Sequence, residues 1–292
     1  MKYIEKHPMT MIVIGVVGIS LSSIFVKYSA APSAVTAAWR LLWTVLLMTP
    51  VVIGKKSVRQ EMKHLKPRTL FLSVLSGLFL AVHFAVWFES LRHTTVASST
   101  TIVCTEVIWV SLGYWLFLKG KLPPKALLAI AVTLLGSVLI AWADSAGGSF
   151  HLYGDMLALA AAIAVAVYTL IGRIVRAETS TTVYTYLCYA ACAAALLVMC
   201  LMQGHALLGY GISAILVGLL LSLFSTILGH SIFSWCLKYF SPSFVSASKL
   251  CEPVVAAVLA AFLFGEIPAM LQLCGGALIL GGVLYYSGIE GK

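Results

Sequence analysis

Ten apolar segments, each about 20 residues long, follow one another along this chain of 292 residues. An α-helix needs a run of that length to cross a bilayer, whereas a β-barrel strand needs about half as many residues. Only 10% of the residues are charged, against about 25% in soluble proteins. The sequence therefore predicts an all-α integral membrane protein with ten transmembrane helices, near residues 9–27, 34–54, 69–91, 96–117, 125–142, 152–172, 182–203, 211–237, 243–264 and 269–287.

The basic residues lie almost entirely on one side of this predicted bundle. If the N-terminus is cytoplasmic, fifteen lysines and arginines fall in the cytoplasmic segments, and only Lys27 and Arg92 fall on the other side. Cytoplasmic loops are enriched in Lys and Arg, so we expect a multi-pass protein of the cell membrane (plasma or inner) with both termini cytoplasmic. The net charge of +9 then reflects topology and contact of the basic 55–68 loop with anionic lipid headgroups. No nucleic-acid partner is expected.

The sequence offers no sign of a metal or cofactor site. None of the seven cysteines forms a CxxC pair, and Cys188 and Cys192 have no His or carboxylate at zinc-site spacing. Nucleotide-binding and hydrolase motifs are also missing from the sequence. The first apolar segment, with a core of about 17 residues, is longer than the hydrophobic region of a signal peptide, so we interpret it as a membrane span.

An internal repeat divides the chain into residues 1–146 and 147–292. A shift of 146 residues aligns Lys27 with Arg173, Glu106 with Glu252 and Gly136 with Gly282. Each half then holds five helices, and because five is odd the two halves must enter the membrane from opposite sides. This inverted-repeat plan is typical of secondary transporters, whose substrate site lies near the midplane where the repeats meet.

The two repeat-related acids are the first candidates for that site. A carboxylate at mid-membrane depth costs about 2.5–3.5 kcal/mol on insertion scales, so it usually has a function. Lys249 and Glu252 are three residues apart, which predicts an ion pair on one helix face that is either functional or structural. Glu106 has no basic residue at helical spacing, so its carboxyl is a candidate for taking up a proton and coupling transport to a proton gradient.

Further candidates are a histidine and a tryptophan on one helix face, His83 and Trp87, together with His230 and Trp109. The histidines serve either as proton relays and substrate contacts or as interhelical hydrogen-bond donors. The two tryptophans could line an aromatic cavity for an organic cation or an aromatic ring. Arg40, near the end of its helix, either extends to the membrane surface or binds a substrate carboxylate in a bidentate manner.

Two sequence stretches suggest a family. Cys251–Val254, followed by Leu263–Pro268, resembles the end of an EamA domain of the drug/metabolite transporter (DMT) superfamily, and Gly154–Asp155, Tyr168 and Gly172–Arg173 fit the sixth helix of the same pattern. The whole chain resembles two tandem EamA-like repeats. This resemblance implies ten helices, cytoplasmic termini, and export or exchange of small metabolites. The first half departs from the pattern because Val107 stands where a proline is expected, which predicts a straighter fourth helix than ninth.

We therefore expect a secondary active transporter, and not an enzyme, that exports or exchanges a small organic solute. An amino acid or related zwitterion fits best, because Arg40 and Lys249 oppose Glu106 and Glu252 in charge. One alternative is proton-coupled efflux of lipophilic or quaternary cations, if only the glutamates and tryptophans face the cavity. An alternative of another class is a membrane-embedded enzyme that uses His83 or His230 as a base. The sequence leaves the substrate, the coupling ion, the direction of transport and the oligomeric state open.

Overall fold

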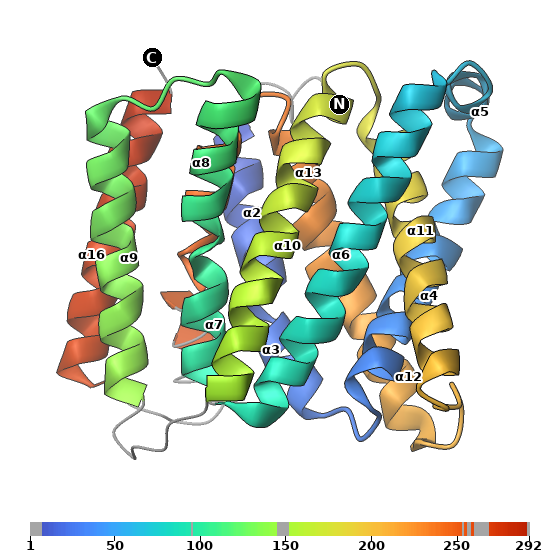
Figure 1. Cartoon of the computed structure of the whole chain (residues 1–292), viewed down its shortest axis with the longest axis horizontal. Coiled ribbons are helices and arrows are strands. Elements are labelled where there is room, and N and C mark those ends of the chain that lie inside the picture. The colour runs from blue at the N-terminus through green and yellow to red at the C-terminus, as the bar shows by residue number, and fades with distance from the viewer. Residues whose placement is uncertain are drawn as a thin grey trace.

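A computed structural model describes residues 8–94, 96–144, 152–252, 254–255, 258–259 and 269–290. Within these residues the protein is helical and contains no strand, and the long helices run side by side between the two ends of a bundle (Figure 1). The helices are α2 (Pro8–Ser20), α3 (Ser22–Lys27), α4 (Ser33–Gly54), α5 (Lys56–Lys63), α6 (Pro67–His93), α7 (Val96–Cys104), α8 (Glu106–Leu118), α9 (Pro124–Asp144), α10 (Leu152–Arg176), α11 (Thr181–Met202), α12 (Gly211–Leu220), the π-helix η1 (Leu221–His230), α13 (Ser231–Cys236), α14 (Pro242–Lys249) and α16 (Met270–Glu290).

Eight helical segments of the described chain are long and apolar enough to cross a membrane, and Pro124–Ile140 is a shorter apolar helix. These nine segments coincide with nine of the ten predicted spans. The remaining one, 243–264, is described only as α14 and a few residues beyond it, and the rest lies outside the described residues. An all-helical membrane protein is confirmed, and the count of ten stays a prediction.

The surface of the bundle is apolar, and its interior holds many polar side chains among the apolar ones. Phe117 exposes 81% of its surface and Phe71 64%, whereas Ser73, Ser76 and Thr44 are fully buried. Such an arrangement suits a lipid environment, where polar side chains turn inward to find partners and apolar side chains face the acyl chains. The buried apolar residues form two large clusters, one centred on α4, α6, α10 and α11 and the other on α2, α9, α13, α14 and α16.

The connections rich in Lys and Arg all lie at one end of the bundle. Helix α5, the connections 119–123 and 237–241, and the end of α10 with its two arginines are at the top of Figure 1, together with the start of α2 and the end of α16. We call this the basic end. Lys66 there donates to Glu178 at 2.8 Å, and this hydrogen bond and charge hold the pKa of the exposed Glu178 carboxyl below its usual value. Both ends of the described chain thus lie on the side where the basic residues gather.

Local chemistry fixes the helix ends at the basic end. Ser180 and Ser241 cap α11 and α14 by accepting from the N–H groups of Val183 and Phe244. Lys119 ends α8 in a left-handed conformation (φ 51°), and the N–H of Gly120 then donates to the carbonyl of Tyr114 at 2.9 Å. These caps set where the chain reverses and which residues of the next helix face the interior.

Candidate functional site

A small cavity lies between the two apolar clusters, near the middle of the bundle. It has a volume of about 50 Å³, which is room for a few water molecules. Seven of the eight predicted site residues line it, and they come from α4, α6, α8, η1, α14 and the residues that follow α14. The lining residues are Ile19, Ser22, Arg40, His83, Trp87, Val103, Glu106, Val165, Ser225, His230, Lys249 and Glu252.

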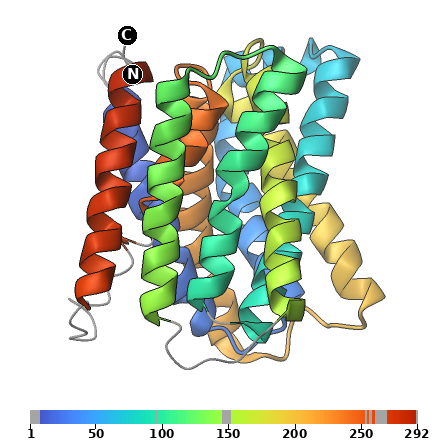
Figure 2. The same cartoon turned by 60° about the vertical axis from the view of Figure 1, so that its left-hand side comes forward.

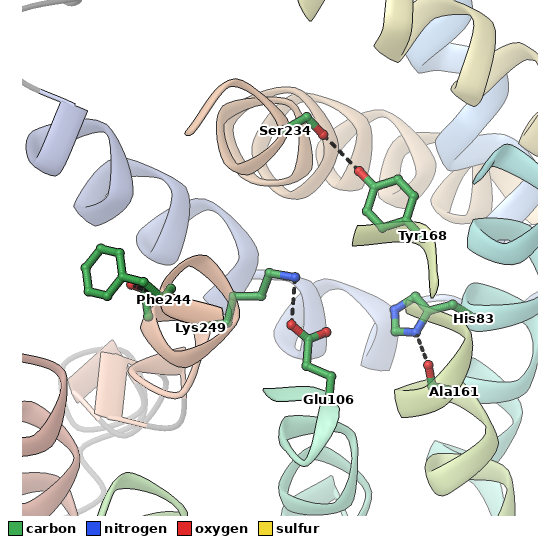
Figure 3. Close-up of polar contacts among 8 residues, drawn as sticks. His83, Glu106, Ala161, Tyr168, Ser234, Phe244 and Lys249 are labelled. Atoms are coloured by element: carbon green, nitrogen blue, oxygen red, sulfur yellow. Dashed lines mark hydrogen bonds and ion pairs between the residues drawn. The ribbon is translucent and has the colours of Figure 1, made fainter. Parts of the chain in front are cut away.

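An ion pair crosses this cavity from one half of the chain to the other. The Nζ atom of Lys249 lies 2.8 Å from Oε1 of Glu106, and their side chains are only 12% and 6% exposed. Figure 3 shows the lysine of α14 pointing directly at the carboxylate at the start of α8. The predicted pairing of Lys249 with Glu252 is wrong, because α14 ends at Lys249 and the two residues therefore do not share a regular helix face. In the described part of the chain, Glu252 has neither an ion pair nor a hydrogen bond.

Each repeat-related acid follows directly on a break in its helix. A turn at Thr105 separates α7 from α8, and the N–H and hydroxyl of Thr105 both donate to the carbonyl of Ile102. A turn at Cys251 likewise precedes Glu252, with its N–H donating to the carbonyl of Ser248. Whether the fourth helix is straighter than the ninth stays a prediction, because most of the ninth lies outside the described residues. Pro253 lies outside the described residues.

Arg40 is the most deeply buried charged residue of the site, with 1% of its surface exposed. Its Nε donates to Thr226 at 2.7 Å and its Nη1 to Ser22 at 3.4 Å, while the guanidinium lies 4.1 Å from the centre of the Phe84 ring. The alternative in which Arg40 extends to the membrane surface is therefore wrong. Hydroxyls and a ring hold it, and no carboxylate pairs with it among the described residues.

The two histidines lie on one wall of the cavity in an aromatic cluster. The ring of His83 stacks on Trp87 with centroids 5.9 Å apart, and His230 packs edge-on against Phe84 and Tyr168. Nδ1 of His83 lies 3.0 Å from the carbonyl of Ala161, so it carries a proton and donates (Figure 3). His83 is thus an interhelical hydrogen-bond donor whose other face lines the cavity. Trp109 is the one candidate that is not among the lining residues.

Three side chains that line the cavity carry buried donors without a partner. These are Nη2 of Arg40, Nε1 of Trp87 and Oγ of Ser225, all unpaired within the described structure. A buried polar group left without a hydrogen bond costs about 1–3 kcal/mol, so three around one cavity call for an explanation. Ser22 and Ser225 were not predicted as site residues, and a lone serine gives little signal. Ser225 does belong, however, to the visible polar stripe Ser225–Thr226–His230.

The π-helix η1 brings this stripe to the cavity. The hydroxyls of Thr226 and Ser231 donate to the carbonyls of Leu221 and Thr226, five residues back, which is the π-helical spacing. Thr226 then reaches Arg40, and Ser222 accepts from Thr44 at 2.8 Å. π-Helical segments within α-helices occur often at functional sites, and this one holds the arginine in position.

A model of the EamA-like transporter family matches residues 8–142 and 152–288. An uncharacterized transporter of Archaeoglobus fulgidus is 25% identical over 275 residues, which cover 94% of this chain and 93% of the relative. A riboflavin transporter of Brucella anthropi is 27% identical over 134 residues, 45% of this chain and 44% of its own. One solved crystal structure has the same fold, with a TM-score of 0.79, 17% identity and 98% coverage of both chains.

Proposed function

Because the chain belongs to the EamA-like transporter family, we propose that it is a secondary active transporter that carries a small organic solute by alternating access. The solute binds between the halves at the position of this cavity, which widens as the halves rearrange so that it opens first to one side of the membrane and then to the other. The observation that carries this proposal is the convergence of Arg40, Glu106, Lys249 and Glu252 on one cavity. Ionisable residues within a membrane mark substrate and ion pathways.

The packing of α9 against α16 supports two inverted repeats. These helices lie side by side in both views and run in opposite directions (Figures 1 and 2). A Cβ atom on Gly136 would meet Gly275 and Ile279, and one on Gly282 would meet Ala129 and Thr133. Adding 146 to 129, 133 and 136 gives 275, 279 and 282, so each side of the contact repeats the other. A two-fold axis between the helices explains this register.

The other long helices also contact one another in pairs that recur at equivalent positions of the two halves. Helix α6 packs on α10 and α11, and in the second half the corresponding η1 region packs on α2 and α4. Helices α4 and α11 contact each other, as do α8 and α14, and each of these pairs joins the same position of the two halves. Such a set of contacts is expected when one five-helix unit is rotated onto the other.

We propose further that the substrate is an amino acid or a related zwitterion. The three unpaired buried groups that line the cavity can all donate, and a carboxylate supplies the acceptor oxygens that Arg40, Trp87 and Ser225 lack. The unpaired carboxylate of Glu252 can accept from an ammonium group. Glu106 is already neutralised by Lys249. A lipophilic cation would leave the donors unpaired and would face Arg40, so the cation-efflux alternative fits less well.

Flux into proteoliposomes that contain the purified protein tests both proposals. Counterflow of labelled amino acids, tetraalkylammonium ions and riboflavin, the last because of the Brucella anthropi relative, should give accumulation of an amino acid alone. Accumulation of a quaternary amine would support the cation alternative instead. Absence of counterflow for every probe, together with absence of stabilisation of the protein by a broader metabolite panel, would contradict the zwitterion assignment.

A further inference from the structure

The site contains one lysine for two carboxylates that occupy equivalent positions in the repeat. Glu106 and Glu252 both follow a helix break, at Thr105 and Cys251, and both line the same cavity. A strict repeat would place a second lysine at position 103, which is Val103. One ammonium group therefore has two candidate partners, and among the described residues it pairs with Glu106.

We propose that Lys249 is a mobile counter-ion that pairs with Glu106 in the conformation seen here and with Glu252 in the conformation that faces the other side. This inference rests on the proposed alternating access. It makes the carboxylate partner of Lys249 depend on which side of the membrane the cavity faces. In either conformation one carboxylate is paired and the other is free, and the free one is available to a proton or to the ammonium group of the substrate.

The local geometry makes such an exchange feasible. Lys249 is the last residue of α14, and the following turn at Leu250 and Cys251 is closed by hydrogen bonds to residues three back, so no regular helix face fixes the lysine relative to Glu252. Its Nζ also lies 5.5 Å from the centre of the Phe233 ring, so the carboxylate is not the ammonium group's only favourable contact.

The energetics favour two discrete states over intermediate ones. A charged group left unpaired in a buried site is costly, so a Lys249 ammonium group held between the two acids, paired with neither, is unfavourable. Exchange of one lysine between them keeps the number of ion pairs constant, so neither state has fewer ion pairs than the other. The other titratable or charged groups around the cavity are Arg40, His83 and His230. Arg40 is already engaged by Thr226, Ser22 and Phe84, so Lys249 is the cation that can move.

The basic end provides a readout for the two states. Arg173 and Arg176 of α10 donate to the carbonyls of Leu237 and Ser234, which ties α10 to the end of α13 at this side of the bundle. Amide hydrogen exchange of residues 173–181 and 234–241, measured by mass spectrometry on the full chain in lipid nanodiscs, reports how often this end opens. Exchange of residues 28–34 reports on the opposite end.

The decisive experiment compares Glu106→Gln with Glu252→Gln. Glu106→Gln leaves Glu252 as the lysine's only acid partner, so amide exchange should rise by about fivefold or more at one end and fall at the other. Glu252→Gln should do the reverse. In a Lys249→Met background the two substitutions should no longer differ. Glu89→Gln, outside the cavity, is the matched control and should leave the balance of the two ends unchanged.

A purely structural ion pair predicts a different pattern. Glu106→Gln would then raise exchange throughout the protein, and Glu252→Gln would do little; that result, or a shift of both variants in the same direction, overturns the proposal. Suppose that, in the unmodified protein, amide exchange rises at one end while it falls at the other between pH 5 and pH 8, but the two variants do not change exchange in opposite directions. The counter-ion role is then refuted and alternating access is not. If the two ends never vary reciprocally under any condition, alternating access fails and the counter-ion role fails with it.

Discussion

The surroundings of Arg40 support the proposal that the substrate carries a carboxylate. A buried guanidinium without a carboxylate partner is costly, and hydroxyl contacts with Thr226 and Ser22 compensate only part of that cost. One of its nitrogens remains without a partner within the described structure. The simplest physical reason to keep such a residue is a ligand that completes its hydrogen bonds during part of the transport cycle.

Replacement of Arg40 tests whether it binds the substrate. We expect Arg40→Gln to raise the KM for a transported amino acid by about tenfold or more, because a charge-assisted hydrogen bond contributes about 1.5–3 kcal/mol. Arg40→Lys should recover only part of the affinity, since an ammonium group does not present a planar fork. Thr226→Val is the control, because it removes the hydroxyl that positions Arg40 and keeps the charge. Concentration-dependent counterflow gives these values, and an unchanged KM in Arg40→Gln would contradict the role.

The candidate residues were visible in the sequence because charge inside an apolar run is costly whatever the fold. Their partners were not visible. Lys249 lies 143 residues from Glu106, and nothing in local spacing favours that partner over Glu252, three residues away. Arg40 likewise meets Thr226 across 186 residues. Which residues pair depends on which helices contact each other and at what depth in the membrane, so the pairing follows from helix packing.

At the scale of elements, close helix contacts depend on glycines at specific depths. Gly136 and Gly282 lie at the contact of α9 with α16, where a Cβ atom would come within 2.5 Å of the Gly275 carbonyl and 2.6 Å of the Thr133 side chain. Gly281, next to Gly282, has nothing within 4 Å of the position of a Cβ atom. Small residues let membrane helices approach closely, and this pair does so in a repeat-related way.

Alanine substitutions test the contact between α9 and α16. Gly136→Ala and Gly282→Ala should each destabilise the protein by about 1–3 kcal/mol, as overpacking of a tight contact does. Gly281→Ala should have no measurable effect, since its Cβ atom meets open space. Thermal unfolding midpoints in detergent measure the difference, and equal midpoints for all three variants would be inconsistent with the symmetric contact.

On the scale of the whole molecule, the gathering of basic connections at one end predicts orientation in the membrane. Ser57 is exposed in α5 at the basic end, and Ala30 is exposed at the other end. In a background where the exposed Cys274 is replaced by serine, a cysteine at Ala30 should react with a membrane-impermeant maleimide on intact cells. A cysteine at Ser57 should react only after permeabilisation. Labelling in the opposite order would reverse the predicted topology.

Hydropathy, charge and internal spacing were enough to predict the all-helical class, nine of the described segments and the identity of most cavity residues. These features can be detected along the sequence without knowledge of the packing, because a bilayer imposes a helix length and a charge bias on any chain that crosses it. The breaks at Thr105 and Cys251, the π-helix η1, the pairing of Lys249 with Glu106 and the burial of Arg40 depended on three-dimensional packing. Each of these arises where hydroxyls, carbonyls and charges from distant segments compete for one another, and local spacing carries no record of which contact is the more stable.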